Sequence, residues 1–325
     1  MSDIAFGTID RSRVDEALTM FKRVFNREIS KEYYYWQYFD SCFGGGLSKG
    51  VWIDGKLVSH IGYTPRDCII NGTSGKALSN HTVMNDPAYR GKGYYARLVS
   101  WALQEFAGQG YEMVFTRPNR ESHPAQMMQK EYVEIELLPS MTWRGKNTSP
   151  RDPADGLIER LERCRMFDDE YQPLIDVTVA GKKYYIQRSP EYYNWRFCRH
   201  PMSKYYTFEY REAGRLLSSA VVKLFPQERP TRINIVEWLG AADNRTAGEA
   251  VIKSILDIAD TYGLEVQMWH NRHDKNRHYW IEKSGFAMDV PVFYFGAYPL
   301  ASSERLGAFT DFRSWYTAMG DHDIF

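Results

Sequence analysis

The residues best suited to chemistry are Arg90, Gly91, Lys92 and Gly93, which form a turn between a β-like run and a helix-like run over 96–106. Glycines one residue apart let the backbone turn without Cβ clashes, and they leave consecutive N–H groups exposed at a helix N-terminus. Such a nest binds anions, and two cationic side chains beside it suit a diphosphate better than a lone carboxylate. A solvated turn that carries two basic residues is the alternative.

The composition restricts the possible partners. The chain has 325 residues, which favours two domains or one large one, and its 41 basic and 41 acidic residues cancel. Zero net charge gives no support to nucleic acid or an anionic membrane as a partner, and no apolar run approaches the roughly 18 residues of a membrane span. Nothing near residue 1 resembles a signal peptide. We therefore expect a cytoplasmic protein.

Four cysteines are scattered through the chain, at positions Cys42, Cys68, Cys164 and Cys198. Their spacing contains no C-x-x-C or C-x-x-H pattern, so neither a zinc site nor a disulfide framework is indicated. We expect four reduced thiols and no metal.

The first half of the chain predicts a mixed α/β (α+β) domain over residues 1–145. Apolar residues at helical spacing favour a first helix, and the Asp-Gly and Asn-Gly pairs favour hairpins. The elements expected in chain order are a helix over 8–26, an aromatic helix over 32–39, hairpins at 54–55 and 71–72, a helix over 96–109, a strand over 112–116, a helix from about 122 and a last strand over 134–143.

The second half repeats the first. Three matches occur in the same order: 32–36 (EYYYW) with 191–195 (EYYNW), 55–59 (GKLVS) with 214–218 (GRLLS), and 119–120 with 271–272 (both NR). Ordered matches of this kind indicate two copies of one fold. We therefore expect a second domain over 157–325, joined to the first by a proline-rich linker at 146–156.

The two copies differ at the glycine turn. Where the second should carry R-G-K-G, it has the run 239–247 with Asp243 and Asn244. An acidic residue at that point disfavours a phosphate. We expect only the first copy to bind a diphosphate.

The stretch from Asn85 through the following helix resembles the acyl-CoA pyrophosphate loop of the GCN5-related N-acetyltransferases, whose pattern is R/Q-x-x-G-x-G/A. Arg90 and Gly93 match it, whereas Tyr95 stands where the family has its last Gly or Ala. The resemblance implies two tandem domains of this family and an acyl-CoA co-substrate, either acetyl-CoA or a 3-hydroxyacyl-CoA. The loop residues that it implies as contacts are Arg90, Gly91, Lys92, Gly93, Tyr94, Tyr95 and Ala96.

The same resemblance implies further contacts in the first copy. The strand before the loop would pair its backbone with the pantetheine arm through Thr82, Val83 and Met84, and Asn119 would bind the same arm. Asn119 could instead cap its helix, with Ser122 as a rival for either task.

Proton transfer needs its own groups. His81 is the titratable candidate for a general base near pH 7, and a structural histidine in the sheet is the alternative. The tyrosine that the family uses as a general acid falls at Met128, and Tyr132 lies a turn away. A CoA thiolate leaves without help, so we still expect an enzyme.

Candidate acceptor residues lie in the second copy. His270, Asn271 and Arg272 form a polar cluster that is either an acceptor-binding loop or a solvated one. The i, i+3 histidines lack a third ligand, so we expect no metal there. The last residues are aromatic and acidic, and either they grip a cationic amine or they are a docked tail; the candidates are Trp315, Asp321 and Asp323.

An intact first copy and a degenerate second one resemble the dual-domain N-acyltransferases of nucleotide-linked amino sugars. The resemblance implies a dTDP-linked amino-deoxy sugar as the small-molecule acceptor, for surface polysaccharide synthesis, held between the two halves. One alternative is N-acetylation of another small amine or of a peptide amine. The other is a CoA-binding sensor module without catalysis.

Overall fold

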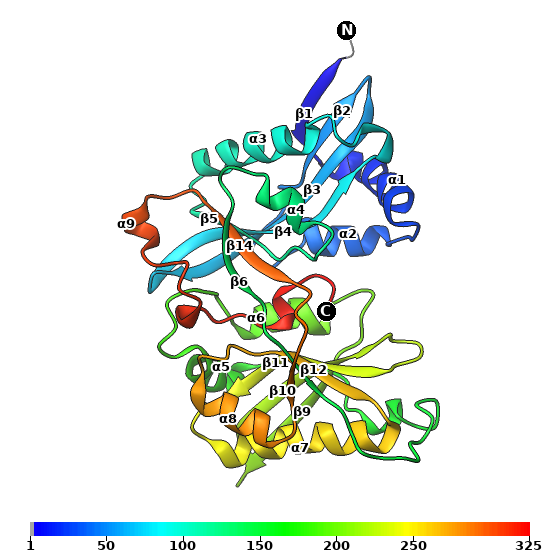
Figure 1. The fold of residues 1–325 in the computed structure, drawn as a ribbon, viewed down its shortest axis with the longest axis vertical. Helices are drawn as coiled ribbons and strands as arrows, with labels where there is room; N and C mark the ends of the chain where they lie inside the picture. The colour runs from blue at the N-terminus through cyan, green and yellow to red at the C-terminus, as the bar shows by residue number, and fades with distance from the viewer. Residues whose placement is uncertain (1–2) are drawn as a thin grey trace. The chain divides into compact units, whose positions relative to one another are not determined.

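The computed structural model describes residues 3–325 as two compact units (Figure 1). The first unit contains the chain up to residue 136 together with residues 293–310, and the second contains residues 137–292 and 311–325. Each unit is therefore built from two separate stretches of chain.

The first unit is a mixed sheet with helices on both faces. Its strands lie in the order β1-β2-β3-β4-β5-β14-β6, with β4 and β5 parallel and β14 antiparallel to β5. Its elements are β1 Ile4–Thr8, η1 Arg11–Arg13, α1 Val14–Phe25, α2 Lys31–Tyr38, β2 Lys49–Ile53, β3 Lys56–Ile70, β4 Thr73–Asn85, η2 Pro87–Tyr89, α3 Tyr94–Gly108, β5 Met113–Thr116, α4 His123–Met127, β6 Val133–Leu137, β14 Tyr294–Pro299 and α9 Ser303–Leu306.

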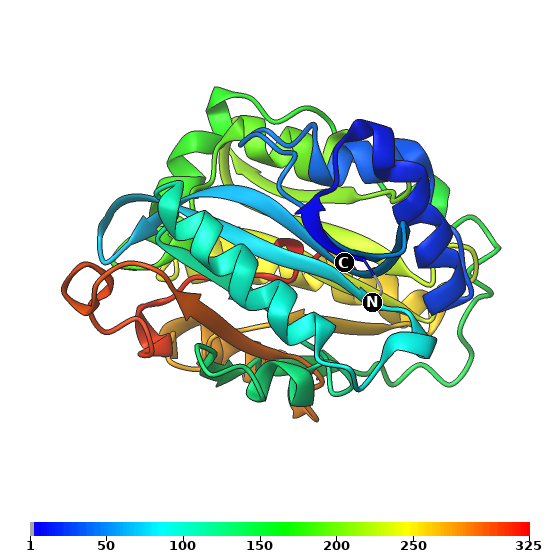
Figure 2. The same ribbon diagram turned by 90° about the horizontal axis from the view of Figure 1, so that it is seen from above.

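Two apolar clusters attach the helices to this sheet. Helix α3 packs Leu98 and Phe106 against one face, and α1 and α2 cover the other with residues such as Phe21 and Tyr38 (Figure 2). Burial of these side chains, worth about 25 cal/mol per Å² of apolar surface, fixes the helices on the strands that they cover.

The second unit has the same plan. Its strands lie in the order β13-β7-β12-β11-β10-β9, and β11 and β12 are parallel. Its elements are β7 Ser140–Trp143, η3 Ile158–Arg160, η4 Asp169–Tyr171, α5 Gln172–Val179, β8 Tyr185–Ile186, α6 Pro190–Tyr193, η5 Asn194–Cys198, β9 Tyr206–Glu212, β10 Arg215–Phe225, β11 Arg232–Gly240, α7 Arg245–Tyr262, β12 Glu265–Trp269, α8 Lys275–Lys283, β13 Ala287–Asp289, η6 Phe312–Ser314 and η7 Met319–Asp321.

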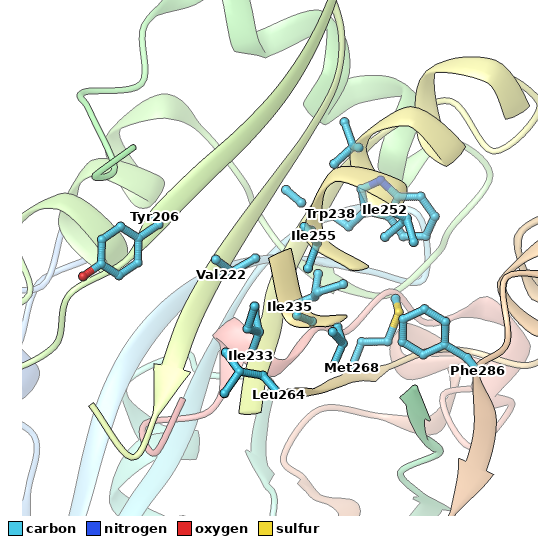
Figure 3. Packing of buried hydrophobic residues seen from close by; sticks show 14 of the residues in the cluster. Tyr206, Val222, Ile233, Ile235, Trp238, Ile252, Ile255, Leu264, Met268 and Phe286 are labelled. Atoms are coloured by element: carbon cyan, nitrogen blue, oxygen red, sulfur yellow. The ribbon is translucent and has the colours of Figure 1, made fainter. Parts of the chain in front are cut away.

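The core of the second unit lies between α7 and the sheet. Ile252 and Ile255 of α7 pack over Ile233 and Ile235 of β11, and Trp238 closes the same layer (Figure 3). This cluster is the counterpart of the one beneath α3 in the first unit.

The repeat predicted from the sequence is confirmed as a repeated fold. The order β9-β10-β11-α7-β12-α8 reproduces β2-β3-β4-α3-β5-α4, and both units place a parallel strand after the crossover helix. The hairpin signals are confirmed as well, since Asp54 and Asn71 have φ of 49° and 51°, each followed by a glycine with positive φ.

Several expected boundaries differ from the structure. The strand expected over 134–143 is two strands, because β6 belongs to the sheet of the first unit and β7 pairs with β12 and β13 in the second. Conversely, β14 lies between the two stretches of the second unit in sequence yet pairs with β5. The helix expected over 8–26 begins at Val14, after strand β1. The pairing of a strand with a segment far away in the chain leaves no local sequence signal. Hydrophobic periodicity therefore could not predict it.

Candidate active site

In the first unit, β4 and β5 stop pairing part-way along β4, and we call this point of separation the slot. Their parallel pairing runs from Ala77 and Met113 to Ser79 and Phe115 and goes no further. Strand β4 nevertheless continues to Asn85, and the far side of β5 is occupied by β14. The edge of β4 beyond Ser79 therefore faces the slot with backbone groups that β5 does not pair, as in an edge strand ready to bind an extended ligand.

A β-bulge shapes β4 at the slot. His81 pairs with Gly62 and Met84 with His60, so that Thr82 and Val83 together oppose a single residue of β3. Thr82 has φ of 45°, a left-handed conformation that costs a non-glycine residue free energy and persists only where its surroundings hold it.

Two tyrosines and a histidine hold the bulge. The hydroxyl of Tyr38 donates to Thr82 Oγ1 over 2.6 Å, and His60 Nδ1 lies 3.0 Å from the Thr82 carbonyl oxygen. Since a carbonyl only accepts, Nδ1 carries the proton, and His60 Nε2 accepts from the Tyr34 hydroxyl at 2.9 Å. Burial lowers the pKa of His60 to about 4, against the opposing hydrogen bond to Thr82, so its ring is neutral near pH 7.

Helix α2 places both tyrosines because they are four residues apart on one face. Its first turn is capped by Ser30, whose hydroxyl accepts from the Tyr33 N–H over 3.1 Å. The ring of Tyr38 lies directly over Gly62, where a Cβ would approach it within 2.4 Å. This network was not predicted from the sequence. The signals that could have indicated it are the tyrosines at i and i+4 and the glycine opposite them.

The turn after β4 is anchored by Asp86. Its carboxylate accepts from the Ala88 N–H at 3.0 Å and pairs with Lys56 at 2.9 Å and Arg23 at 3.1 Å. Although burial pushes the other way, Lys56, the Ala88 N–H and Arg23 hold the pKa of Asp86 below its usual value. The turn therefore has a fixed starting point at the end of β4.

The glycine turn leads into α3 as expected. Gly91 and Gly93 have φ of 74° and 76°, values that favour glycine, and a Cβ at either would meet no atom within 4 Å. Arg90 and Lys92 are exposed beside them, and α3 begins at Tyr94. The N-terminal amides of a 15-residue helix, with two cations at their mouth, form a site suited to a phosphate group.

Tyr95 does not obstruct this turn. Its ring packs into the cluster beneath α3, where Tyr63 and Tyr298 are near enough to interact with it electrostatically. The departure from a small residue is accommodated in the core, and the backbone amides of Tyr94, Tyr95 and Ala96 stay in the first turn of the helix.

Different environments surround the other predicted residues of the first unit, which are His81, Asn119 and Ser122. His81, on β4, is only 6% exposed. Asn119 Oδ1 accepts from the backbone N–H groups of Glu121 and Ser122 and from the Ser122 hydroxyl at 2.9 Å. Asn119 and Ser122 therefore form a local turn. Their predicted contact with pantetheine stays a prediction.

Met128, at the position where the family carries its general acid, is 84% exposed. Tyr132 is the phenol nearest to it in sequence. The Tyr132 ring covers Gly296, where a Cβ would lie within 2.4 Å of it, and its hydroxyl has no hydrogen-bond partner among the described residues. Burial, followed by the charge of Glu134 and then by Tyr95, raises the pKa of Tyr132. The phenol is therefore a protonated donor near pH 7.

The corresponding region of the second unit is filled by its own side chains. Arg277 donates to the Gly240 carbonyl and Thr178 Oγ1 accepts from the Gly240 N–H, while the Asn244 side chain caps α7 through the Ala247 N–H. Gly91 and Gly93 of the first unit are exposed, whereas the N–H groups of Gly240 and Ala247 in the second unit have hydrogen-bond partners. That only the first copy binds a diphosphate stays a prediction.

The predicted acceptor residues fall into two groups. His270, Asn271 and Trp315 line one pocket of the second unit, although the Asn271 amide is already committed to the carbonyls of Phe312 and Trp315. Arg272 is exposed and does not line that pocket.

The two acidic residues predicted to grip an amine have partners within the protein. Both oxygens of Asp321 accept from Arg188 at 2.7 and 2.8 Å, deep in the second unit, and Asp323 pairs with His322 at 2.9 Å. The docked-tail alternative therefore describes Asp321 better than amine binding, because a buried carboxylate bound to a guanidinium has little capacity for a second cation.

This geometry can be compared with known proteins. Residues 6–127 match the family model of an acetyltransferase (GNAT) domain. That segment contains the bulge, the slot and the glycine turn. A search of curated protein sequences found no match.

Solved structures share the fold of the whole chain. A protein from Enterococcus faecalis described as a probable N-acyltransferase has a TM-score of 0.63 at 15% identity, over 91% of this chain and 72% of its own. A GCN5-related N-acetyltransferase from Anabaena variabilis has 0.64 at 12%, over 92% and 73%. Saccharomyces cerevisiae N-myristoyltransferase, solved with myristoyl-CoA, has 0.61 at 11%, over 92% and 79%. The fold is that of two-domain GNAT-like proteins.

Two further features concern the described residues. Among residues 3–325, no three histidine, cysteine, aspartate or glutamate side chains gather closely enough to hold a metal ion. None of the helices in that part of the chain combines the length and apolar character that a membrane crossing requires.

Proposed function

We propose that this chain is a CoA-dependent N-acyltransferase whose first unit binds acyl-CoA. The observation that carries the proposal is the unpaired edge of β4, which leads directly to the glycine turn at the N-terminus of α3. An extended pantetheine arm would pair with Thr82, Val83 and Met84 as a strand. Its diphosphate would then accept from the amides around Gly91 and Gly93.

The bulge gives this arrangement its chemistry. Backbone groups at Thr82 and Val83, turned out of the ladder with β3, would polarise the thioester carbonyl where negative charge develops. The amine nitrogen then bonds to the carbonyl carbon, the C–S bond breaks, and the electron pair leaves with the sulfur. Because Tyr38 and His60 hold Thr82 in place, these donors are positioned before the substrate arrives.

Two side chains are candidates for the proton transfers. The attacking amine must lose a proton, and we assign this step to His81, directly or through water. The departing thiolate must gain a proton. The phenol of Tyr132, in the same unit, is protonated near pH 7 and could donate it. A thiolate leaves readily, so we expect its protonation to matter less than removal of the amine proton.

For the acceptor we propose a nucleotide-linked amino-deoxy sugar, of the dTDP class, used in surface polysaccharide synthesis. The support is the layout of the two copies. The first copy is intact, whereas the second retains the fold but lacks the glycine turn; at that point Arg277 donates to the Gly240 carbonyl and Asn244 caps α7. A copy released from CoA binding is free to serve the acceptor. Another small amine or a peptide amine is the competing acceptor.

Thiol release from acetyl-CoA and a 3-hydroxyacyl-CoA, with a panel of amines, tests both levels of the proposal. We expect turnover with a dTDP-amino sugar and little with the free amino sugar, because nucleotide binding energy contributes to the transition state. Equal turnover of the two sugars would refute the nucleotide-linked acceptor. Binding of CoA without turnover of any amine would favour the sensor module.

A further inference from the structure

A small pocket lies wholly within the second unit, where β11 and β12 separate. Pairing of these strands ends at Ile235 and Met268, and residues 236–238 and 269–271 form the walls beyond. Residues 315–318 form a third wall. The volume is about 50 Å³, and at roughly 10–15 Å³ per water molecule this space suits a few waters or a small anion.

Two buried polar atoms on side chains that line this pocket lack a hydrogen-bond partner among the described residues. They are Nε2 of His270, which is 7% exposed, and Nε of Arg277, which is 6% exposed. A buried polar group left unsatisfied costs about 1–3 kcal/mol, so a ligand that satisfies both gains affinity. Lys182 lines the same pocket and directs one hydrogen bond, over 3.0 Å, to the Arg313 carbonyl.

The imidazole of His270 is an acceptor at its unpartnered atom. Burial, followed by the charges of His278, Arg277 and Lys182, lowers its pKa to about 3. A hydrogen bond to the Asp274 backbone acts in the opposite direction, as a carbonyl that accepts the ring proton does. Since Nε2 is the atom without a partner, the proton lies on Nδ1, and Nε2 presents a lone pair.

The guanidinium of Arg277 is fixed in orientation. Its two terminal nitrogens donate to the carbonyls of Trp238 and Gly240, and its plane lies over the Trp238 ring, 4.6 Å from the centroid. Of the N–H donors that are left, the one on Nε belongs to a nitrogen with no hydrogen-bond partner among the described residues.

The charged side chains that line the pocket are two carboxylates and two cations. The Glu237 carboxylate accepts from Tyr316 and Tyr193 and lies 3.4 Å from Arg188, and the Asp274 carboxylate accepts from the Arg277 backbone N–H at 3.5 Å. Both carboxylates are therefore engaged within the protein, whereas Arg277 Nε has no hydrogen-bond partner among the described residues. Unused N–H donors favour a ligand with acceptor oxygens.

We propose that this pocket binds a small oxyanion that carries a hydroxyl proton, the class of hydrogen phosphate, phosphate monoesters and α-hydroxy carboxylates. The ligand O–H donates to His270 Nε2, and its charged oxygens accept from Arg277 Nε and Lys182 Nζ. Each unpartnered atom then has a complementary group. This inference is independent of the acyl-CoA site.

Calorimetric titrations of the full chain, saturated with CoA so that the first unit's glycine turn is covered, test the proposal. The probes form two pairs that differ in the hydroxyl proton: phosphate with sulfate, and lactate with acetate. We expect one site per chain and at least roughly tenfold weaker binding of the proton-free member, because it leaves His270 Nε2 facing a bare oxygen. The pair that binds distinguishes a phosphate from a carboxylate ligand.

Variants locate the site. Lys182→Met should weaken binding of the preferred probe roughly tenfold or more, whereas the matched Lys253→Met, at an exposed position of α7, should leave it unchanged. His270→Asn, whose amide reaches the position of Nδ1 but not that of Nε2, removes the lone pair and should abolish the preference for the hydroxylated member. CoA binding at the parent affinity shows that each variant is folded. Absence of binding by all four probes, equal binding within both pairs, or parent-like binding by Lys182→Met would overturn the proposal.

Discussion

The hydroxyl of Tyr38 donates to Oγ1 of Thr82, the residue of β4 whose backbone is left-handed. The two residues are 44 positions apart, on a helix and a strand that the sequence does not visibly connect. A left-handed non-glycine residue costs of order 1–3 kcal/mol, so contacts of this kind are what keep the bulge in place. The proposed catalytic geometry depends on them.

Removal of this hydroxyl tests that dependence. Tyr38→Phe should lower kcat for acyl transfer by roughly tenfold, because the backbone groups at the bulge that polarise the thioester carbonyl lose their fixed position, while the CoA dissociation constant changes little. Steady-state kinetics and a CoA titration measure the two effects. Tyr35→Phe, on the same helix but stacked beside Arg11, is the matched control. Equal kcat in both variants would mean that the bulge needs no support from Tyr38.

Replacement of His81 tests the proposed base. His81→Ala should reduce kcat by roughly 10²-fold or more, with the affinity for CoA nearly retained, since a general base contributes to the chemical step and not to thioester binding. The pH dependence of kcat in parent and variant is the second readout. If the acidic limb of that profile is unchanged, proton removal by water or by the substrate itself is the better explanation.

The neutral state of His60 predicts a pH-dependent stability. Its pKa is about 4 in the fold and 6.5 for an exposed histidine, so between these values the unfolded chain binds a proton that the folded chain does not. The free energy of unfolding should therefore fall as the pH drops from 6.5 towards 4, by roughly 1.4 kcal/mol per pH unit from this residue, and be unaffected by it above 6.5.

Urea unfolding at pH 7, 6 and 5 measures this contribution. In His60→Asn the amide nitrogen can take the place of Nδ1 and donate to the Thr82 carbonyl but does not titrate, so the loss of stability between pH 7 and 5 should be smaller than in the parent. The other buried histidines, His81, His200 and His270, are present in both proteins. Identical pH slopes would mean that His60 is not held neutral.

The local features of this fold could be predicted from the sequence. Asp54-Gly55 and Asn71-Gly72 determine their own turns, α2 was found from its aromatic run, and the glycine turn was identified from residues 90–93 and their flanks. Each depends on residues adjacent in sequence, where backbone sterics and helical spacing are decisive.

What could not be predicted depends on distant contacts. Nothing near residues 294–299 indicates that they pair with β5, and nothing near Asp321 indicates that Arg188 takes both of its oxygens. His60 was overlooked because a histidine inside a hairpin is unremarkable until Tyr34 and Thr82 are placed beside it. The residue types of a site can be deduced from the sequence. The charged and polar groups that surround them are known only once the fold is known.

A calorimetric titration of CoA into three proteins tests the central claim most directly. The account predicts one CoA per parent chain, with binding lost in Gly93→Val, because φ of 76° favours glycine and a side chain would fill the open space that the diphosphate needs. Gly110→Val is the matched control, because Gly110 has φ of 82° and equally open surroundings at the far end of α3, so it should cost similar stability yet bind one CoA. Two CoA molecules per parent chain, or unchanged binding in Gly93→Val, would contradict an acyl-CoA site at the glycine turn of the first unit.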